Sequence, residues 1–175
     1  CSGDGRVRAR QTIDIKVPAG VETGNRIQLA GRGEVGAGGG PAGDLYVEIV
    51  EAEHPYLIRD GHNLHVAIEV SFAAASLGTK VKVECLDGEI DVEVRAGTQS
   101  GATIPVRGKG MTRLRAGTRG DLIVHVEVQT PHKLNREQEE LLRKFASSRG
   151  EKPGDVKIKG HEQGFFSKFR DAFGR

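Results

Sequence analysis

The chain has 175 residues and a near balance of charge, with 26 lysines and arginines against 24 aspartates and glutamates. A net charge of +2 gives no reason to expect a nucleic-acid partner, and no apolar run approaches the roughly 18 residues of a membrane-spanning helix. Glycine contributes 25 residues and tryptophan none, which predicts many turns and few large core side chains. No signal peptide opens the chain, so a cytoplasmic location is expected.

The first ten residues, CSGDGRVRAR, contain Cys1, one of two cysteines. Glycines after a cysteine are common in zinc knuckles, because they let backbone amides point at a thiolate. One cysteine cannot hold zinc, since a structural site needs about four ligands, so the residues alone indicate an isolated thiol. The other cysteine, Cys85, falls in a strand-like run, and no disulfide is expected.

Residues 12–17 (TIDIKV) and 43–50 (GDLYVEIV) predict β-strands, the first from its alternation of apolar and polar residues. Between them, Gly31 to Gly36 (GRGEVG) has the G-x-G-x-x-G spacing of a dinucleotide-binding loop. Such a site needs a helix directly after the loop, but AGGGPAG follows. We interpret these glycines as tight turns or bulges between strands.

Residues 61–88 predict two strands around a short helical segment, FAAASLG. Residues 80–94 (KVKVECLDGEIDVEV) predict a hairpin in which Asp87-Gly88 supplies the turn, and 120–128 (GDLIVHVEV) predicts a further strand. In the second half of the hairpin, Ile90, Val92 and Val94 are expected to face the core. The carboxylates between them fit a solvated strand face better than a metal or acid–base site.

The chain repeats itself at an offset of 77 residues. Residues 13–33 match 90–110, and the match continues through GDLYVEI and GDLIVHV. In the second copy Arg113 replaces the third glycine of the loop, which argues against a nucleotide site. The lead-in at 61–88 has no counterpart before the first copy. The sequence therefore predicts a fragment whose first module lacks its opening strands and carries a cysteine-containing insertion at a hairpin turn.

Residues 134–150 (LNREQEELLRKFASSRG) predict a helix that Asn135 and Gln138 cap in a capping-box pattern and that Gly150 ends. Its apolar stripe has two interpretations, packing on its own β module or forming a dimer contact. A polar segment follows, and then residues 165–175 (FFSKFRDAFGR) show the spacing of an amphipathic helix suited to a membrane, a partner subunit or a client groove.

No pattern indicates catalysis. The six histidines show no H-E-x-x-H spacing, G-x-S-x-G is absent, and His62 and His65 are expected to face opposite sides, so neither a metal at the histidines nor an enzyme is predicted. The basic clusters contain no stacking aromatic residue and fit solvated faces better than a nucleic-acid surface. The clusters are Arg6, Arg8 and Arg10, and then Arg107, Lys109, Arg113, Arg115 and Arg119.

Taken together, CSGDG, the repeat, GDLYV, HPYLIRDGHNL, LDG and RGKGM resemble the C-terminal half of the class A J-domain co-chaperones, the bacterial DnaJ family. In that family a module of four C-x-x-C-x-G-x-G repeats binds zinc and interrupts the first of two β domains. Cys1 then resembles the last cysteine of that module. The other ligands are absent, so zinc is expected in the full-length family member and not in this chain.

The resemblance implies a mainly β fold of two tandem, similar, β-sandwich-like modules with a C-terminal dimerisation helix. The implied function is chaperoning in the stress response: binding of non-native polypeptides and their presentation to the 70-kDa heat-shock chaperone by a cytoplasmic homodimer, without the J domain. The expected segments are 1–10 (end of the zinc module), 11–58 (incomplete first β module), 59–131 (second β module), 132–150 (dimerisation helix) and 151–175 (flexible, Phe-rich tail).

An exposed strand edge beside an apolar pocket would take an extended client as an added strand. The family groove implies a client contact at Leu57, with Ile13 and Ile15 as weaker candidates, although Leu57 is equally an ordinary core leucine. Because the opening strands are missing, weak client binding by the first module is expected. The alternative function is a non-catalytic dimerisation scaffold. The dimer contacts implied are Leu141, Leu142 and Phe145.

Overall fold

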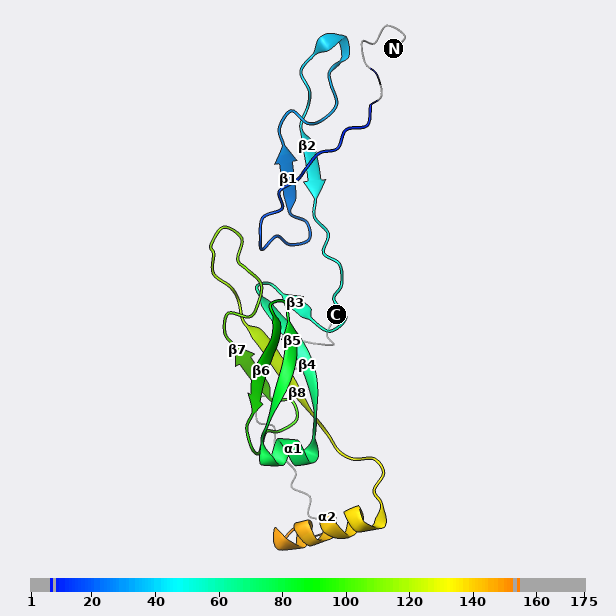
Figure 1. Ribbon diagram of the computed structural model, residues 1–175, viewed down its shortest axis with the longest axis vertical. Helices are drawn as coiled ribbons and strands as arrows, with labels where there is room; N and C mark the ends of the chain where they lie inside the picture. Colours follow the sequence, from blue (N-terminus) through cyan, green and yellow to red (C-terminus); the bar gives the residue numbers. More distant parts are fainter. Residues whose placement is uncertain (1–6, 8, 153, 155–175) are drawn as a thin grey trace. The chain divides into compact units, whose positions relative to one another are not determined.

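The computed structural model describes residue 7, residues 9–152 and residue 154. It separates into two units, Cys1–Thr130 and Pro131–Arg175, which are described in turn. The first unit contains several small β-sheets and the second contains a helix (Figure 1). The predicted mainly β fold with a C-terminal helix is therefore confirmed.

The largest sheet of the first unit has four strands in the order β3-β4-β8-β7. Its centre is a parallel pair, β4 (Asn63–Ser71) and β8 (Leu122–Gln129), in which Leu64 lies opposite Leu122. The outer strands, β3 (Ile58–Asp60) and β7 (Thr103–Val106), pair antiparallel with them. Apolar residues alternate with polar ones along β4 and β8, so one face of the sheet is buried.

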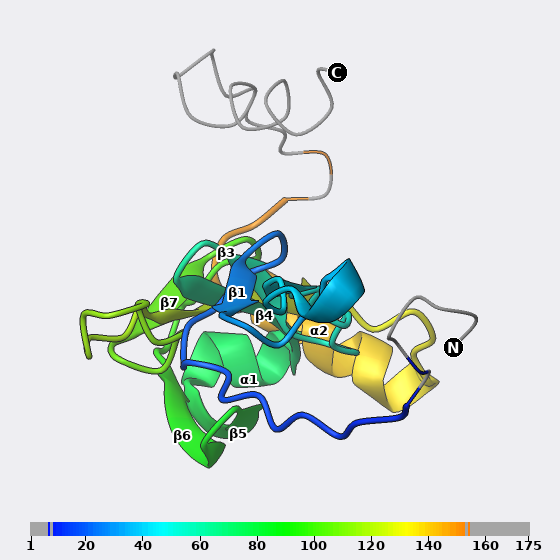
Figure 2. The ribbon, with the colours of Figure 1, turned by 90° about the horizontal axis from the view of Figure 1, so that it is seen from above.

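A hairpin covers that buried face. Its strands, β5 (Thr79–Cys85) and β6 (Gly88–Val94), form a separate two-stranded sheet, seen beside the larger sheet in Figure 2. The short helix α1 (Phe72–Leu77) connects β4 to β5 and begins where the Ser71 hydroxyl accepts a hydrogen bond from the Ala74 amide. Between the two sheets lies the main apolar core: Leu57, Leu64, Val66, Val83, Cys85, Val92, Leu122 and Val124.

The turn of this hairpin lies one residue earlier than expected. Cys85 pairs with Gly88, so Leu86 and Asp87 form the two-residue loop, and the predicted Asp87-Gly88 turn is wrong by one position. Gly88 instead opens β6 with φ +100°, a conformation that favours glycine. The predicted inward face is confirmed, because Val92 and Val94 are almost fully inaccessible to solvent and the half-buried Ile90 packs against the main core.

The first repeat forms a smaller hairpin of β1 (Arg26–Leu29) and β2 (Leu45–Glu48), with a short 3-10 turn, η1 (Ala37–Gly39), in its loop. The strand predicted at residues 12–17 does not form. Its counterpart in the second repeat is β6, which pairs with β5. The described part of the first repeat has no segment equivalent to β5, so residues 12–17 have no strand to pair with.

The two repeats nevertheless share one hydrogen-bond scaffold at the offset of 77. In both, the first loop glycine has φ near +67°: Gly31 at +66° and Gly108 at +68°. GRGEVG is therefore a turn between β1 and β2, as interpreted. The matching bonds are Gly24 N to Ile49 O with Gly101 N to Val126 O, Gly33 N to Gly43 O with Gly110 N to Gly120 O, and Gly31 N to Asp44 Oδ1 with Gly108 N to Asp121 Oδ1.

The second unit contains α2 (Arg136–Ser148). Its start is a capping box, in which Asn135 Oδ1 accepts from the Gln138 amide and Gln138 Oε1 accepts from the Asn135 amide, both at 2.9 Å. Gly150 follows the helix with φ +71°. The predicted helix and both of its end signals are confirmed. No helix in the part of the chain described is both long and apolar enough to cross a membrane.

Candidate functional site

The residues expected to line a client groove lie in two different environments. Leu57 is only 6% exposed and belongs to the main core beneath β5 and β6, which is the core role that the sequence left open. Ile13 and Ile15 are half-buried in the segment that forms no strand. The structure does not test whether any of the three contacts a client, so that role stays a prediction.

The β1–β2 hairpin presents a partly covered apolar face. Ile27 pairs with Val47 and Leu29 with Leu45, and all four side chains are half-buried. We call these four residues the hairpin face. Tyr46, on the neighbouring position of β2, is 59% exposed. Because β1 and β2 form a two-stranded sheet in the described residues, each strand has an edge that no other described strand covers.

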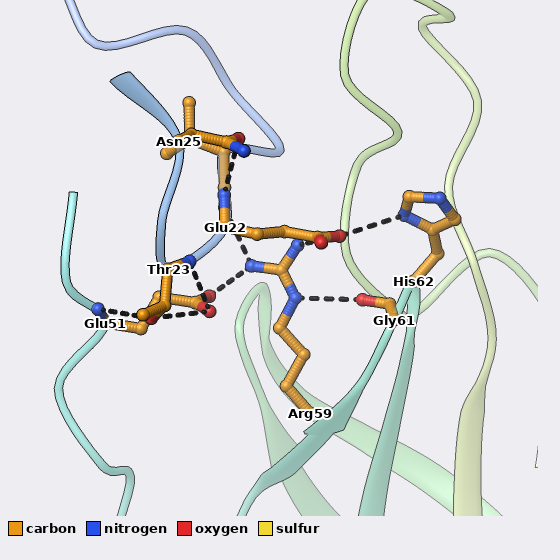
Figure 3. A network of polar contacts seen from close by, with 8 residues as sticks. Glu22, Thr23, Asn25, Glu51, Arg59, Gly61 and His62 are labelled. Carbon is orange, nitrogen blue, oxygen red and sulfur yellow. Dashed lines mark hydrogen bonds and ion pairs between the residues drawn. The ribbon is translucent and has the colours of Figure 1, made fainter. Parts of the chain in front are cut away.

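Arg59 of β3 connects the four-stranded sheet to the first repeat (Figure 3). Its Nη1 donates to the Val21 carbonyl at 2.8 Å and to the Glu51 carboxylate, and its Nη2 donates to Glu22 Oε1 at 2.9 Å. Its Nε donates to the Gly61 carbonyl at 2.8 Å. The Arg59 side chain is only 15% exposed. Two carboxylates balance its charge, and its hydrogen bonds join β3 to the first repeat.

Further polar contacts order the stretch of the first repeat that Arg59 binds. The Glu51 amide donates to Thr23 Oγ1 at 2.9 Å, and the Glu22 amide donates to Asn25 Oδ1 at 3.0 Å. His62 Nδ1 lies 3.9 Å from Glu22 Oε1 (Figure 3). Sequence reasoning missed this network. The only signal was an arginine directly after the apolar residues of YLIRDG, and its partners lie up to 38 residues away.

A pocket of about 540 Å³ lies between residues 18–27 of the first repeat and residues 112–117 of the second. The backbones meet closely beside it, because a Cβ added to Gly20 would lie 2.2 Å from the Thr112 carbonyl oxygen. Pro18, Val21, Ile27 and Leu114 give the pocket apolar walls, and Arg26, Arg113 and Arg115 add positive charge.

Asp87, in the β5–β6 turn, forms ion pairs with two basic residues of the loop at residues 107–120. Arg119 Nη1 donates to its Oδ2 at 2.7 Å, and Lys109 Nζ lies 3.4 Å from the same oxygen. The hydrogen bond from Arg119 lowers the pKa of Asp87 below its usual range. In the first repeat, the Gly31 amide and then Gln28 lower the pKa of Asp44 in the same way. Two of the basic residues predicted as solvated, Lys109 and Arg119, thus have a structural partner.

Two histidines meet on the outer face of the sheet, a contact that the sequence did not reveal. His65 Nδ1 and His125 Nε2 are 2.9 Å apart, and their rings stack with centroids 5.2 Å apart. They come from the neighbouring parallel strands β4 and β8. In the part of the chain the structure describes, no three His, Cys, Asp or Glu side chains gather closely enough to hold a metal ion.

The zinc module implied by the family resemblance consists of C-x-x-C repeats, and the sequence of this chain contains no C-x-x-C pair. A structural zinc site needs about four thiolate or imidazole ligands, and the chain has two cysteines. Cys85 is buried in the main core, where its thiol donates to the Gly88 carbonyl. Cys1 lies outside the described residues, as do Arg6, Arg8 and the Phe-rich end at 165–175.

The residues predicted to form a dimer lie on α2. Leu141 is 58% exposed, Phe145 is 45% exposed and Leu142 is half-buried. They share one side of the helix, since Leu141 and Leu142 lie four and three residues before Phe145, and residues three or four apart in a helix are neighbours on its surface. The predicted apolar stripe is therefore present on this helix, and its role in assembly stays a prediction.

Comparison with known proteins assigns both units to related families. The family described as DnaJ C terminal domain matches residues 4–131, and the family described as Chaperone protein DnaJ C-terminal region matches residues 137–175. Among curated proteins, Chaperone protein DnaJ 2 of Streptomyces avermitilis is 57% identical over 169 residues, and that of Streptomyces coelicolor is 58% identical over 169. Each alignment covers 97% of this chain and 45% of the relative.

Chaperone protein DnaJ 2 of Mycobacterium tuberculosis is 47% identical over 175 residues, which are 99% of this chain and 46% of that protein. The chain therefore spans a little under half the length of the curated relatives that it matches.

Proposed function

The chain belongs to the DnaJ family of chaperones, as their non-catalytic C-terminal region, and from this premise we propose that it binds non-native polypeptides and presents them to the 70-kDa heat-shock chaperone. The observation that carries the proposal is the β1–β2 hairpin. It combines a half-buried apolar face with strand edges that no other described strand covers. A surface of this kind suits a client whose sequence is not fixed.

The proposed mode of binding is strand addition. An extended client would bond to the backbone of an uncovered edge, which gives affinity without regard to side chains. Large apolar side chains of the client would then contact the hairpin face. Ile13 and Ile15 are the more accessible of the other proposed contacts, whereas Leu57 is 6% exposed and would contact a client only after leaving the core.

Client binding is tested by suppression of aggregation of a chemically denatured protein, together with fluorescence anisotropy of a labelled apolar peptide. We expect the double variant Leu29→Gln, Leu45→Gln to weaken peptide binding about tenfold, because it removes a cross-strand pair of apolar contacts. Leu77→Gln is the matched control, since Leu77 is 81% exposed and lies in α1. Circular dichroism checks that both variants remain folded.

The alternative is a non-catalytic scaffold that only spaces and pairs other domains. A scaffold would suppress aggregation only when present in excess over the denatured protein. Failure of the wild-type chain to act at lower ratios would therefore contradict the client-binding proposal.

We also propose that α2 makes a homodimer through Leu141, Leu142 and Phe145. The exposed apolar stripe supports this, because burial of such side chains against a second copy is favourable. Leu141→Gln with Phe145→Gln is expected to shift the sedimentation of the chain to that of a monomer. The control is Glu139→Gln with Arg143→Gln, which alters an i,i+4 ion pair elsewhere on the helix. Equal dimer affinity in both variants would contradict the proposed contact.

The remaining proposals concern the longer protein that the relatives represent. We propose a zinc site in that protein whose last cysteine is Cys1, a cytoplasmic location and the segment boundaries given above. The repeated hydrogen-bond scaffold supports two β modules within residues 11–58 and 59–131.

A further inference from the structure

We propose that the pocket between residues 18–27 and 112–117, here called the junction pocket, binds acidic segments of a polypeptide by holding one apolar side chain between arginines. The inference rests on the proposed function, because it assigns a sequence preference to part of the polypeptide binding. The junction pocket shares Ile27 with the hairpin face but differs from it in chemistry, because arginines line the pocket whereas the four residues of the hairpin face are all apolar.

The apolar part of the junction pocket comes from both repeats. Pro18, Val21 and Ile27 line it from the first repeat, and Leu114 lines it from the second. Its volume of about 540 Å³ lies within the range of about 300–1,000 Å³ that is usual for ligand sites. Leu114 is 37% exposed although it stands in a polar loop, so an apolar occupant would cover it.

The charge of the junction pocket selects the occupant. Three arginines line it and no aspartate or glutamate does. Arg26 pairs with Glu48 at 3.2 Å, whereas Arg113 and Arg115 form no ion pair within the described residues. Guanidinium groups bind carboxylates in a bidentate manner, so two such groups beside an apolar pocket favour glutamate or aspartate next to the anchoring side chain.

Comparison of the repeats shows that the fold does not require these side chains. Arg113, Leu114 and Arg115 stand where the first repeat has Gly36, Ala37 and Gly38. Arg115 has φ +64° and its equivalent glycine has φ +65°, so the backbone takes the same left-handed turn with either residue. Arginine is the less favourable residue there, because a Cβ is strained at positive φ. The loop thus carries a costly arginine at the edge of a pocket, which supports a binding role.

The test uses the 175-residue chain and two fluorescein-labelled peptides of equal length. Both contain the same leucine and phenylalanine, flanked by glutamates in one peptide and by lysines in the other. Anisotropy titrations are expected to show about tenfold tighter binding of the acidic peptide at low salt, with the preference reduced at high salt. The variant Arg113→Glu, Arg115→Glu is expected to abolish or reverse the preference.

Two matched variants separate the pocket from general effects. Arg107→Glu changes an exposed arginine of the same loop that does not line the pocket, and it is expected to keep most of the preference. Leu114→Ser is expected to weaken binding of both peptides at this site, whereas Leu77→Ser is not.

Equal affinity for the two peptides, unchanged by Arg113→Glu, Arg115→Glu, would overturn the junction-pocket proposal. If the chain still suppressed aggregation of a denatured protein in that case, the proposed function would stand without it. Absence of both peptide binding and aggregation suppression would overturn the two proposals together.

Discussion

At the scale of single residues, glycine decides how closely backbone segments approach one another within a repeat. A Cβ added to Gly120 would lie 1.9 Å from the carbonyl oxygen of His62, so the loop before β8 rests directly on the turn between β3 and β4. Gly43 occupies the same position in the first repeat, yet its nearest neighbour atom would be 3.9 Å away. The same residue is therefore required for packing in one repeat and not in the other.

This contrast predicts unequal effects of the same substitution. Gly120→Ala is expected to destabilise the fold by about 2–3 kcal/mol, because a backbone carbonyl must move to admit the methyl group. Gly43→Ala is expected to change stability by less than about 0.5 kcal/mol. Thermal unfolding followed by circular dichroism compares the two, and similar midpoints would show that the loop accommodates the methyl group.

At the scale of elements, the Asp87 carboxylate connects the β5–β6 hairpin to the loop at residues 107–120. Asp87 receives Arg119 and Lys109, and the hydrogen bond from Arg119 lowers its pKa. A lowered pKa in the folded state means that the ionised group stabilises the fold above its ordinary value of 3.8. That stabilisation is lost as the pH falls through the lowered pKa.

Asp87→Asn is therefore expected to reduce the unfolding temperature most at neutral pH and progressively less as the solution is acidified toward about pH 3. Unfolding midpoints across that range measure the effect. Asp14→Asn, at an exposed carboxylate of the first repeat, is the control and should change the midpoint little at any pH. A difference between wild type and Asp87→Asn that did not shrink in acid would rule out the ion pair as its cause.

Most elements follow from local sequence patterns. The capping box at Asn135 and the alternation around Val92 gave the right element because their signals lie within a few residues. The strand at residues 12–17 has an equally clear alternation and still does not form, since alternation says nothing about whether a partner strand is present. Leu57 shows the same limit, because its sequence neighbours do not reveal the β5–β6 hairpin that buries it.

At the scale of the whole molecule, the features that relate the two repeats depend on long-range contacts. Arg59 joins the four-stranded sheet to Val21, Glu22 and Glu51, and the junction pocket combines residues about 90 positions apart. The internal repeat was detectable from the sequence, and matching positions of the two copies form the same backbone hydrogen bonds in their loops. The repeat did not predict the Arg59 contacts or the junction pocket, because both form between the two copies and have no counterpart inside one copy.

Arg59→Gln is expected to destabilise the contact between the first repeat and β3 by roughly 2 kcal/mol, because it leaves two carboxylates without their guanidinium. Amide hydrogen exchange is expected to rise in residues 21–25 and 49–51 while β4 and β8 stay protected. Arg26→Gln is the control, since Arg26 pairs with Glu48 at the surface and is 68% exposed. Unchanged exchange in Arg59→Gln would show that other contacts suffice.

The parallel pairing of β4 with β8 also constrains how the chain is made. Leu64 and Leu122 are partners in the sheet, so about 60 further residues must leave the ribosome after Leu64 before its partner is available. At roughly 5–20 residues per second, this takes several seconds. Throughout that interval the apolar side of β4 has no parallel neighbour. Until β8 has been synthesised, that side of β4 is therefore open to non-native contacts that the finished sheet excludes.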